Sequence, residues 1–198
     1  MFAAIAYVLT VVAHFLKITI VPSVPFLNYD PKDIIICIGG FVLGPIAAFI
    51  ISFVVSLIEM ITISTTGFYG LIMNIISTCA FVIPAALIYK TKRSFKGALL
   101  SLSAGFLSVI VVMTLWNIII TPIYMDVPRD VLINKYLLWI ILFNVIKVGI
   151  NIAFVLLLYK PIMSALRVTH IIKNNNVFDN KESTSIKRII LRRTFRNT

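Results

Sequence analysis

The chain has 198 residues, of which 60% are hydrophobic and 13% are charged, and its mean hydropathy is +1.04. A soluble domain is nearer to about 45–50% apolar and ~25% charged residues, so the composition excludes an ordinary soluble protein. The apolar runs are long and continuous, which favours membrane helices over the short alternating strands of a barrel. We therefore expect an all-α membrane protein that crosses the bilayer several times.

The formal net charge of +11 is concentrated in two segments. One short loop contains Lys90, Lys92, Arg93 and Lys96, and nine more lysines and arginines follow between residues 160 and 196. The positive-inside rule places both segments in the cytoplasm. A basic segment beside a membrane span more often contacts lipid headgroups than nucleic acid, so no nucleic-acid partner is expected.

The sequence lacks the motifs of an enzyme. It has no glycine-rich phosphate loop, no metal-ligand spacing of His and Cys, and no nucleophile elbow. Cys37 and Cys79 fall in apolar runs and are interpreted as core residues. We expect neither an enzyme activity nor a cofactor or metal. If such a chain transports a substrate, it needs a partner to drive the transport, because it has no ATP-binding site of its own.

The first helix is predicted over about residues 1–16. A first span usually has polar residues ahead of it, so we expect the true start to lie upstream or the helix to be clipped. The connection at 17–33 contains three prolines, which forbid a regular helix. It also contains Phe26, Leu27 and Tyr29, so we expect an ordered loop that packs on the rest of the protein.

Gly44 and Pro45 divide the next apolar stretch into a short helix and a second one over about 45–62. A span kinked at Pro84 follows, and the fifth helix is predicted to end near residue 120. The last span is expected over about 137–159, after a loop with two prolines. Small residues on the fifth helix permit close packing, and they are Ser101, Ser103, Ala104, Gly105 and Ser108.

Six transmembrane helices place the N-terminus in the cytoplasm, whereas five would place it outside. The positive-inside rule alone does not decide, because almost no charge flanks the first helix. The Gly-Pro break favours six helices, with the loop between helices 1 and 2 on the outer side. We predict a membrane domain over residues 1–163 and a basic cytoplasmic tail over residues 164–198, so that both termini are cytoplasmic.

Lys147 lies deep in the last apolar span, where a charge costs at least ~2.5–3.5 kcal/mol. Asn144 precedes it by three residues and Asn151 follows by four, so the three side chains share one helix face. This stripe predicts an internal polar site. The alternatives are that Lys147 snorkels or pairs with a buried carboxylate, for which Glu59 is the specific candidate.

A few other polar side chains lie within the predicted helices. Glu59, Asn117 and Asn144 fall toward the outer half, on the side of the long loop, which predicts a cavity that opens outward beneath that loop. For Glu59, a position in the interface among the lipid headgroups is slightly favoured. Asn117 is equally compatible with a role in the site and with a structural role. Asn74 and Asn151 either belong to the site or only form hydrogen bonds between helices, and such bonds average ~0.6 kcal/mol.

Three stretches resemble the S components of energy-coupling factor (ECF) transporters, most closely the riboflavin-specific branch. FLNYDPKDIIICIGGFVLGPIAA is similar to the first loop and second helix of that branch, which tends to read F-L-x-Y/L-D-x-x-D and then G-F-x-x-G-P. TTGFYGLIMNIISTCAFVIPAALIYKTKRSFKGA resembles its fourth helix and basic loop. FNVIK resembles the start of its sixth helix, where an Asn-x-x-Lys pair contributes to flavin binding. The resemblance covers about residues 1–163.

The resemblance implies a bacterial membrane protein that captures a vitamin outside the cell and works with a membrane coupling subunit and two cytoplasmic ATPases. Asn144 and Lys147 match the Asn-x-x-Lys pair, and Asn117 matches an asparagine at the end of the fifth helix. Asn74 is a further candidate from its position. The loop that closes over the ligand is matched by Phe26, Leu27, Asn28, Tyr29 and Asp30. Glu59 departs from the branch, in which no fixed acid is expected there.

A flavin suits these residues chemically, because its ring is flat and largely apolar, with carbonyls and an imide along one edge. Asn144 can match the imide, and Lys147 can donate to carbonyl or ribityl oxygens. A neutral ligand does not require a cation, so flavin mononucleotide, folate and pantothenate stay open. The alternative from another class is a structural membrane protein whose Asn/Lys stripe only packs helices.

Overall fold

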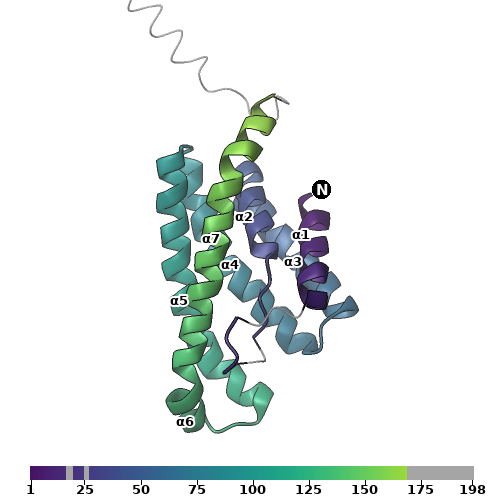
Figure 1. The fold of residues 1–198 in the computed structure, drawn as a ribbon, viewed down its shortest axis with the longest axis vertical. Helices are drawn as coiled ribbons and strands as arrows, with labels where there is room; N and C mark the ends of the chain where they lie inside the picture. The colour runs from purple at the N-terminus through teal and green to yellow at the C-terminus, as the bar shows by residue number, and fades with distance from the viewer. Residues whose placement is uncertain (17–19, 25–26, 169–198) are drawn as a thin grey trace, which may run out of the picture. The chain divides into compact units, whose positions relative to one another are not determined.

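A computed structural model describes residues 1–16, 20–24 and 27–168, and these are all helix or connection (Figure 1). The helices are α1 (Phe2–Leu16), α2 (Lys32–Leu43), α3 (Pro45–Thr62), α4 (Gly67–Thr91), α5 (Phe95–Met125), α6 (Arg129–Val131), a π-helical turn (Leu132–Tyr136) and α7 (Leu137–Val168). Four stretches are long and apolar enough to cross a membrane, namely α3, α4, α5 and Arg129–Ile162. The predicted all-α class is confirmed, and the predicted six helices are compatible with these four spans together with the shorter α1 and α2.

Two helix ends differ from the prediction. The fifth helix continues past residue 120 and includes Pro122, because the residues around this proline stay apolar. It ends where Asp126 adopts a left-handed conformation with φ 52° and its N–H bonds to the carbonyl of Pro122. The last helix likewise continues through Pro161 to Val168 instead of ending near residue 159.

The chain divides into two units, each described by itself. Residues 1–159 form one compact unit. Of the second unit, which begins at Lys160, the structure describes the end of α7. The predicted domain boundary after residue 163 stays a prediction, and most of the predicted basic tail, residues 169–198, lies outside the described residues.

The break between the second and third helices is confirmed. Gly44 has φ 96°, a conformation that other residues rarely adopt, and its N–H closes α2 by bonding to the carbonyl of Gly40 at 2.9 Å. Pro45 is then the first residue of α3, where its missing N–H costs nothing.

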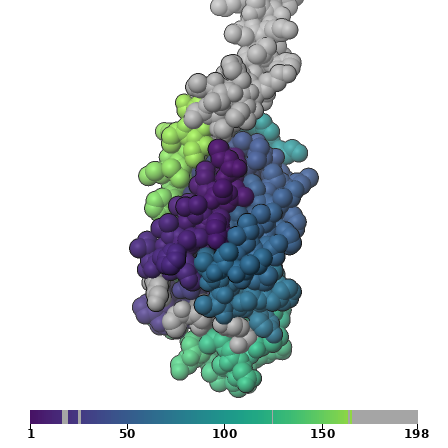
Figure 2. Space-filling view, turned by 90° about the vertical axis from the view of Figure 1, so that its right-hand side faces the viewer, coloured from purple at the N-terminus to yellow at the C-terminus, as the bar shows by residue number. Residues whose placement is uncertain are grey.

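Close packing holds the helices of the first unit together. α4 packs on α5, α3 and α2, and α1 packs on α2 and α3. In Figure 2 the purple side chains of α1 lie on the surface beside the blue side chains of α3. At Gly105 of α5, an added Cβ would lie 2.4 Å from the carbonyl oxygen of Phe81 on α4. The predicted role of Gly105 in close packing is therefore confirmed.

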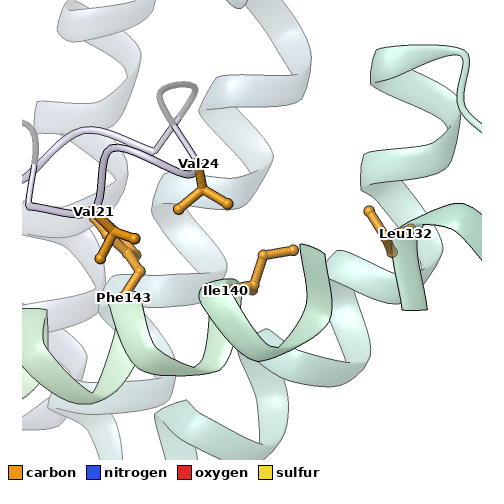
Figure 3. Close-up of a cluster of buried hydrophobic side chains, with 5 residues drawn as sticks. All are labelled: Val21, Val24, Leu132, Ile140 and Phe143. Carbon is orange, nitrogen blue, oxygen red and sulfur yellow. The ribbon is translucent and has the colours of Figure 1, made fainter. Parts of the chain in front are cut away.

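Part of the connection between α1 and α2 packs on the start of α7. Val21 and Val24 are buried in an apolar cluster with Leu132, Ile140 and Phe143 (Figure 3). Burying an aliphatic or aromatic side chain of this size is worth about 1.5–3 kcal/mol. The described part of the connection is thus held by its own apolar residues, while an ordered loop on the outer side of the membrane stays a prediction.

Candidate functional site

A cavity of about 160 Å³ lies among the first, third, fourth, fifth and seventh helices and the segment before α2. One water needs about 10–15 Å³ on this measure, so the cavity has room for a small organic molecule. All predicted site residues that the structure describes line it: Leu27, Asn28, Tyr29, Asp30, Asn74, Asn117, Asn144 and Lys147. Phe26, the remaining one, lies outside the described residues.

The cavity lies at one end of the long helices. Thr66, Tyr69 and Gly70, at the start of α4, belong to its wall. The 25 residues of α4 rise roughly 37 Å, and the basic loop follows its other end. On α4 the cavity wall extends as far as Ser77, so residues 78–91 of this helix separate the cavity from the basic loop.

The first of two charged groups in the wall is the Lys32 cluster, which consists of Asp30, Lys32 and Glu59. The Lys32 ammonium forms ion pairs with Asp30 Oδ2 and Glu59 Oε2. Asp30 Oδ1 accepts from the backbone N–H of Lys32 at 3.1 Å and lies 3.0 Å from Thr10 Oγ1. Burial opposes ionisation of Asp30, but Lys32 and then Lys147 outweigh it and hold the pKa of this carboxyl below its usual range.

Glu59 is partly buried in the cavity wall, with 14% of its side chain exposed. Its second oxygen, Oε1, accepts a hydrogen bond of 3.0 Å from Asn74 Nδ2. This bond joins α3 to α4, as the alternative for Asn74 anticipated, and Asn74 also lines the cavity. The slightly favoured position of Glu59 among the lipid headgroups stays a prediction, and the structure adds that its carboxylate pairs with Lys32.

The second charged group is the Lys147 cluster, which consists of Asp33, Lys147 and Ser77. Lys147 Nζ lies 3.2 Å from Asp33 Oδ2 and 3.5 Å from Ser77 Oγ. Asp33 Oδ1 accepts from Thr78 Oγ1 at 2.6 Å, and Oδ2 accepts from Asn151 Nδ2 at 3.4 Å. These bonds tie α2 to α4 and α7.

One of the alternatives stated for Lys147 was pairing with a buried carboxylate, with Glu59 as the specific candidate. Pairing with a buried carboxylate is confirmed, but the carboxylate is Asp33, because Glu59 is already bound to Lys32. Lys147 also lines the cavity, whereas Asp33 does not. Lys147 is thus a cavity-lining residue whose ammonium pairs with Asp33.

Tyr29 connects the segment before α2 to α7. Its hydroxyl donates to Asn151 Oδ1 at 2.9 Å. Burial, together with the nearby Asp33 and Asp30, raises the pKa of Tyr29 to about 12, so the hydroxyl keeps its proton and stays a donor. Asn151 shares the buried face of Asn144 and Lys147, as predicted, and serves the packing role.

Asn144 and Asn117 are fully buried amides whose positions are set by their own helices. Asn144 Nδ2 donates to the carbonyl of Ile140 at 2.8 Å, and Asn117 Nδ2 donates to that of Met113 at 2.7 Å. An amide nitrogen carries two N–H donors, so each Asn keeps a second N–H for a ligand after this bond.

Lys32 and Asp33 are the parts of the site that sequence reasoning missed. They stand at the first two positions of α2, whereas they were predicted to belong to the connection at 17–33 and were given no role in the site. The useful signal was the pair of aspartates three residues apart, since Lys147 requires a buried anion. Both Lys32 and Asp33 are at most 2% exposed.

Comparisons with known proteins agree on one family. The family model described as ECF transporter, substrate-specific component, matches residues 1–163. The riboflavin transporter RibU of Staphylococcus aureus (strain TCH60) is 30% identical over 174 residues, which cover 84% of this chain and 89% of the relative. A solved structure described as the S component of a bacterial ECF transporter aligns with a TM-score of 0.69 and 29% identity, over 84% of this chain and 93% of that one.

Proposed function

Because the chain belongs to the family of ECF transporter substrate-specific components, which bind a substrate for transport and are not enzymes, we propose that its substrate is riboflavin. The observation that carries the proposal is that Asn144 and Lys147 line one cavity together with residues 27–30. These are the positions that match the flavin-binding pair and the closing loop of the riboflavin branch. The relative named a riboflavin transporter supports the same substrate.

The lining of the cavity has the chemistry that a flavin needs. Leu27, Met113 and Phe143 supply apolar surface for a flat ring. Asn144 and Lys147 supply donors for the carbonyls and imide at one edge of that ring. In this proposal the apolar side chains contact the faces of the ring, and Asn144 and Lys147 bind its polar edge through directed hydrogen bonds.

The cavity opens to the outside of the cell in this proposal. Four cations, Lys90, Lys92, Arg93 and Lys96, lie in or beside the loop after α4. The positive-inside rule therefore places this loop in the cytoplasm, and the cavity lies toward the other end of α4. Thr10 and His14, in the second half of α1, line the cavity, which supports a cytoplasmic N-terminus. α7 runs away from the cavity after Lys147, so the C-terminus is cytoplasmic too.

Uptake also needs a source of energy, and the sequence carries no phosphate-binding loop. We assign this role to a membrane coupling subunit and two cytoplasmic ATPases, which would associate with the chain in the cell membrane. Affinity purification of the tagged chain from its native membrane, with the bound proteins identified by mass spectrometry, tests this part. Recovery of the chain without an ATPase would contradict it.

The substrate is tested by purifying the chain from a flavin-containing host and recording its visible spectrum. We expect a yellow protein with the absorption bands of flavin. Added riboflavin should also quench tryptophan fluorescence of protein that has been stripped of ligand. Colourless protein that ignores riboflavin would contradict the proposal, and folate and pantothenate would then be titrated in the same assay.

A further inference from the structure

The positive and negative charges of the side chains around the cavity are unequal in number. Two lysines, Lys32 and Lys147, pair with three carboxylates, which belong to Asp30, Asp33 and Glu59. If all five groups are ionised, the sum is one negative charge. His14 also lines the cavity, but it is exposed and formally neutral at pH 7.

The hydrogen bonds of the three carboxylates fit their ionised forms. Both oxygens of Glu59 accept, one from the Lys32 ammonium and one from Asn74. Asp33 likewise accepts on both oxygens, from Thr78 on one side and from Lys147 on the other. A protonated carboxyl would need an acceptor for its own hydrogen, whereas these oxygens face donors. Asp30 accepts from the backbone N–H and from the ammonium of Lys32.

Neither lysine is available to a phosphate without giving up a carboxylate. Lys32 is 1% exposed, lies between two carboxylates and does not line the cavity. Lys147 lines the cavity but is held by Asp33 at 3.2 Å. Two carboxylates, on Asp30 and Glu59, belong to the wall itself.

From this charge balance we infer that the cavity selects an uncharged flavin over a phosphorylated one, and that Glu59 determines this selectivity. The inference rests on the proposed riboflavin function. A phosphate brings about two negative charges to a site whose wall is already negative, and no unpaired lysine of the described cavity wall compensates them. Glu59 is the excess carboxylate, because Lys32 keeps Asp30 as a partner when Glu59 loses its charge.

The experiment compares riboflavin with flavin mononucleotide on the purified full chain, by quenching of flavin fluorescence. The wild type should bind riboflavin at least about tenfold more tightly, since a unit charge a few ångströms away is worth roughly that factor. Glu59→Gln should reduce the ratio of the two dissociation constants about tenfold, mainly by tightening the mononucleotide. Glu59→Asp retains the charge and should retain the preference.

Asp130→Asn is the matched control, because it removes the same charge at an exposed position that does not line the cavity. The ratio of the two dissociation constants in Asp130→Asn should equal that of the wild type. Equal affinities of the wild type for both flavins would overturn the inference without any variant, and so would an unchanged ratio in Glu59→Gln. If the wild type binds riboflavin and flavin mononucleotide equally well, only this inference is contradicted. If it does not bind riboflavin at all, the proposed function is contradicted too.

Discussion

The two buried lysines near the cavity differ in what surrounds them. Lys32 is 1% exposed and lies between two carboxylates, whereas Lys147 is 6% exposed and has one carboxylate and one hydroxyl as partners. Lys147 faces the cavity and Lys32 does not. A buried cation that is fully enclosed by anions can only hold the structure together, while a partly satisfied one that faces a cavity can also bind a ligand.

The largest effect should come from removing the enclosed lysine. Lys32→Met leaves Asp30 and Glu59 buried side by side without their cation, and losing one partner of a buried pair already costs about 3–5 kcal/mol. We expect little folded protein in the membrane fraction and a much lower midpoint of thermal unfolding in detergent. Lys96→Met removes an exposed lysine from the start of α5 and is the control. Normal expression of Lys32→Met would show that this cluster is not structural.

Removing the anion paired with Lys147 should have a smaller effect, because Lys147 lines the cavity and is less enclosed than Lys32. Asp33→Asn should lower the free energy of unfolding by about 2 kcal/mol, the usual worth of a hydrogen bond to a charged group. Lys147→Met in addition should restore part of this loss, since it removes the unpaired cation. Additive losses in this double-mutant cycle would mean that the two residues do not interact.

The comparison of the two lysines also shows what could be predicted from the sequence. Lys147 was recognised because it interrupts a long apolar run, where a charge is conspicuous. Lys32 was missed because its burial depends on tertiary contacts, with Glu59 27 residues away on another helix. The helices could be predicted from local apolar runs and from the Gly-Pro break. The pairing of each lysine with its carboxylate could not, because it depends on how distant helices pack, and no local pattern encodes that packing.

If Lys147 is the lysine that serves the ligand, its loss should affect binding more than folding. Lys147→Met should weaken riboflavin binding by roughly 10- to 100-fold, the worth of a charge-assisted hydrogen bond. Asn144→Ala should weaken riboflavin binding to a similar or smaller extent. Asp33 keeps Thr78 and Asn151 as donors in Lys147→Met, so the protein should still fold. Titration of both variants by flavin fluorescence checks this, and failure of both to reach the membrane would favour the packing role.

The smallest effect should come from the link between the two clusters. Tyr29, next to Asp30, donates to Asn151, which in turn donates to Asp33, and this bond holds the cavity-lining residues 27–30 on α7. Tyr29→Phe should cost about 1 kcal/mol of stability, the worth of one neutral hydrogen bond, and should weaken riboflavin binding by up to about fivefold.

Tyr7→Phe is the matched control for Tyr29→Phe. The Tyr7 hydroxyl donates to Thr62 Oγ1 at the same distance of 2.9 Å, but Tyr7 does not line the cavity. Its loss should change thermal stability to a similar or smaller extent and leave the riboflavin dissociation constant unchanged. If the two variants bind riboflavin equally well, the segment before α2 is held by its buried valines alone. The tyrosine bond would then connect the two clusters without contributing to the site.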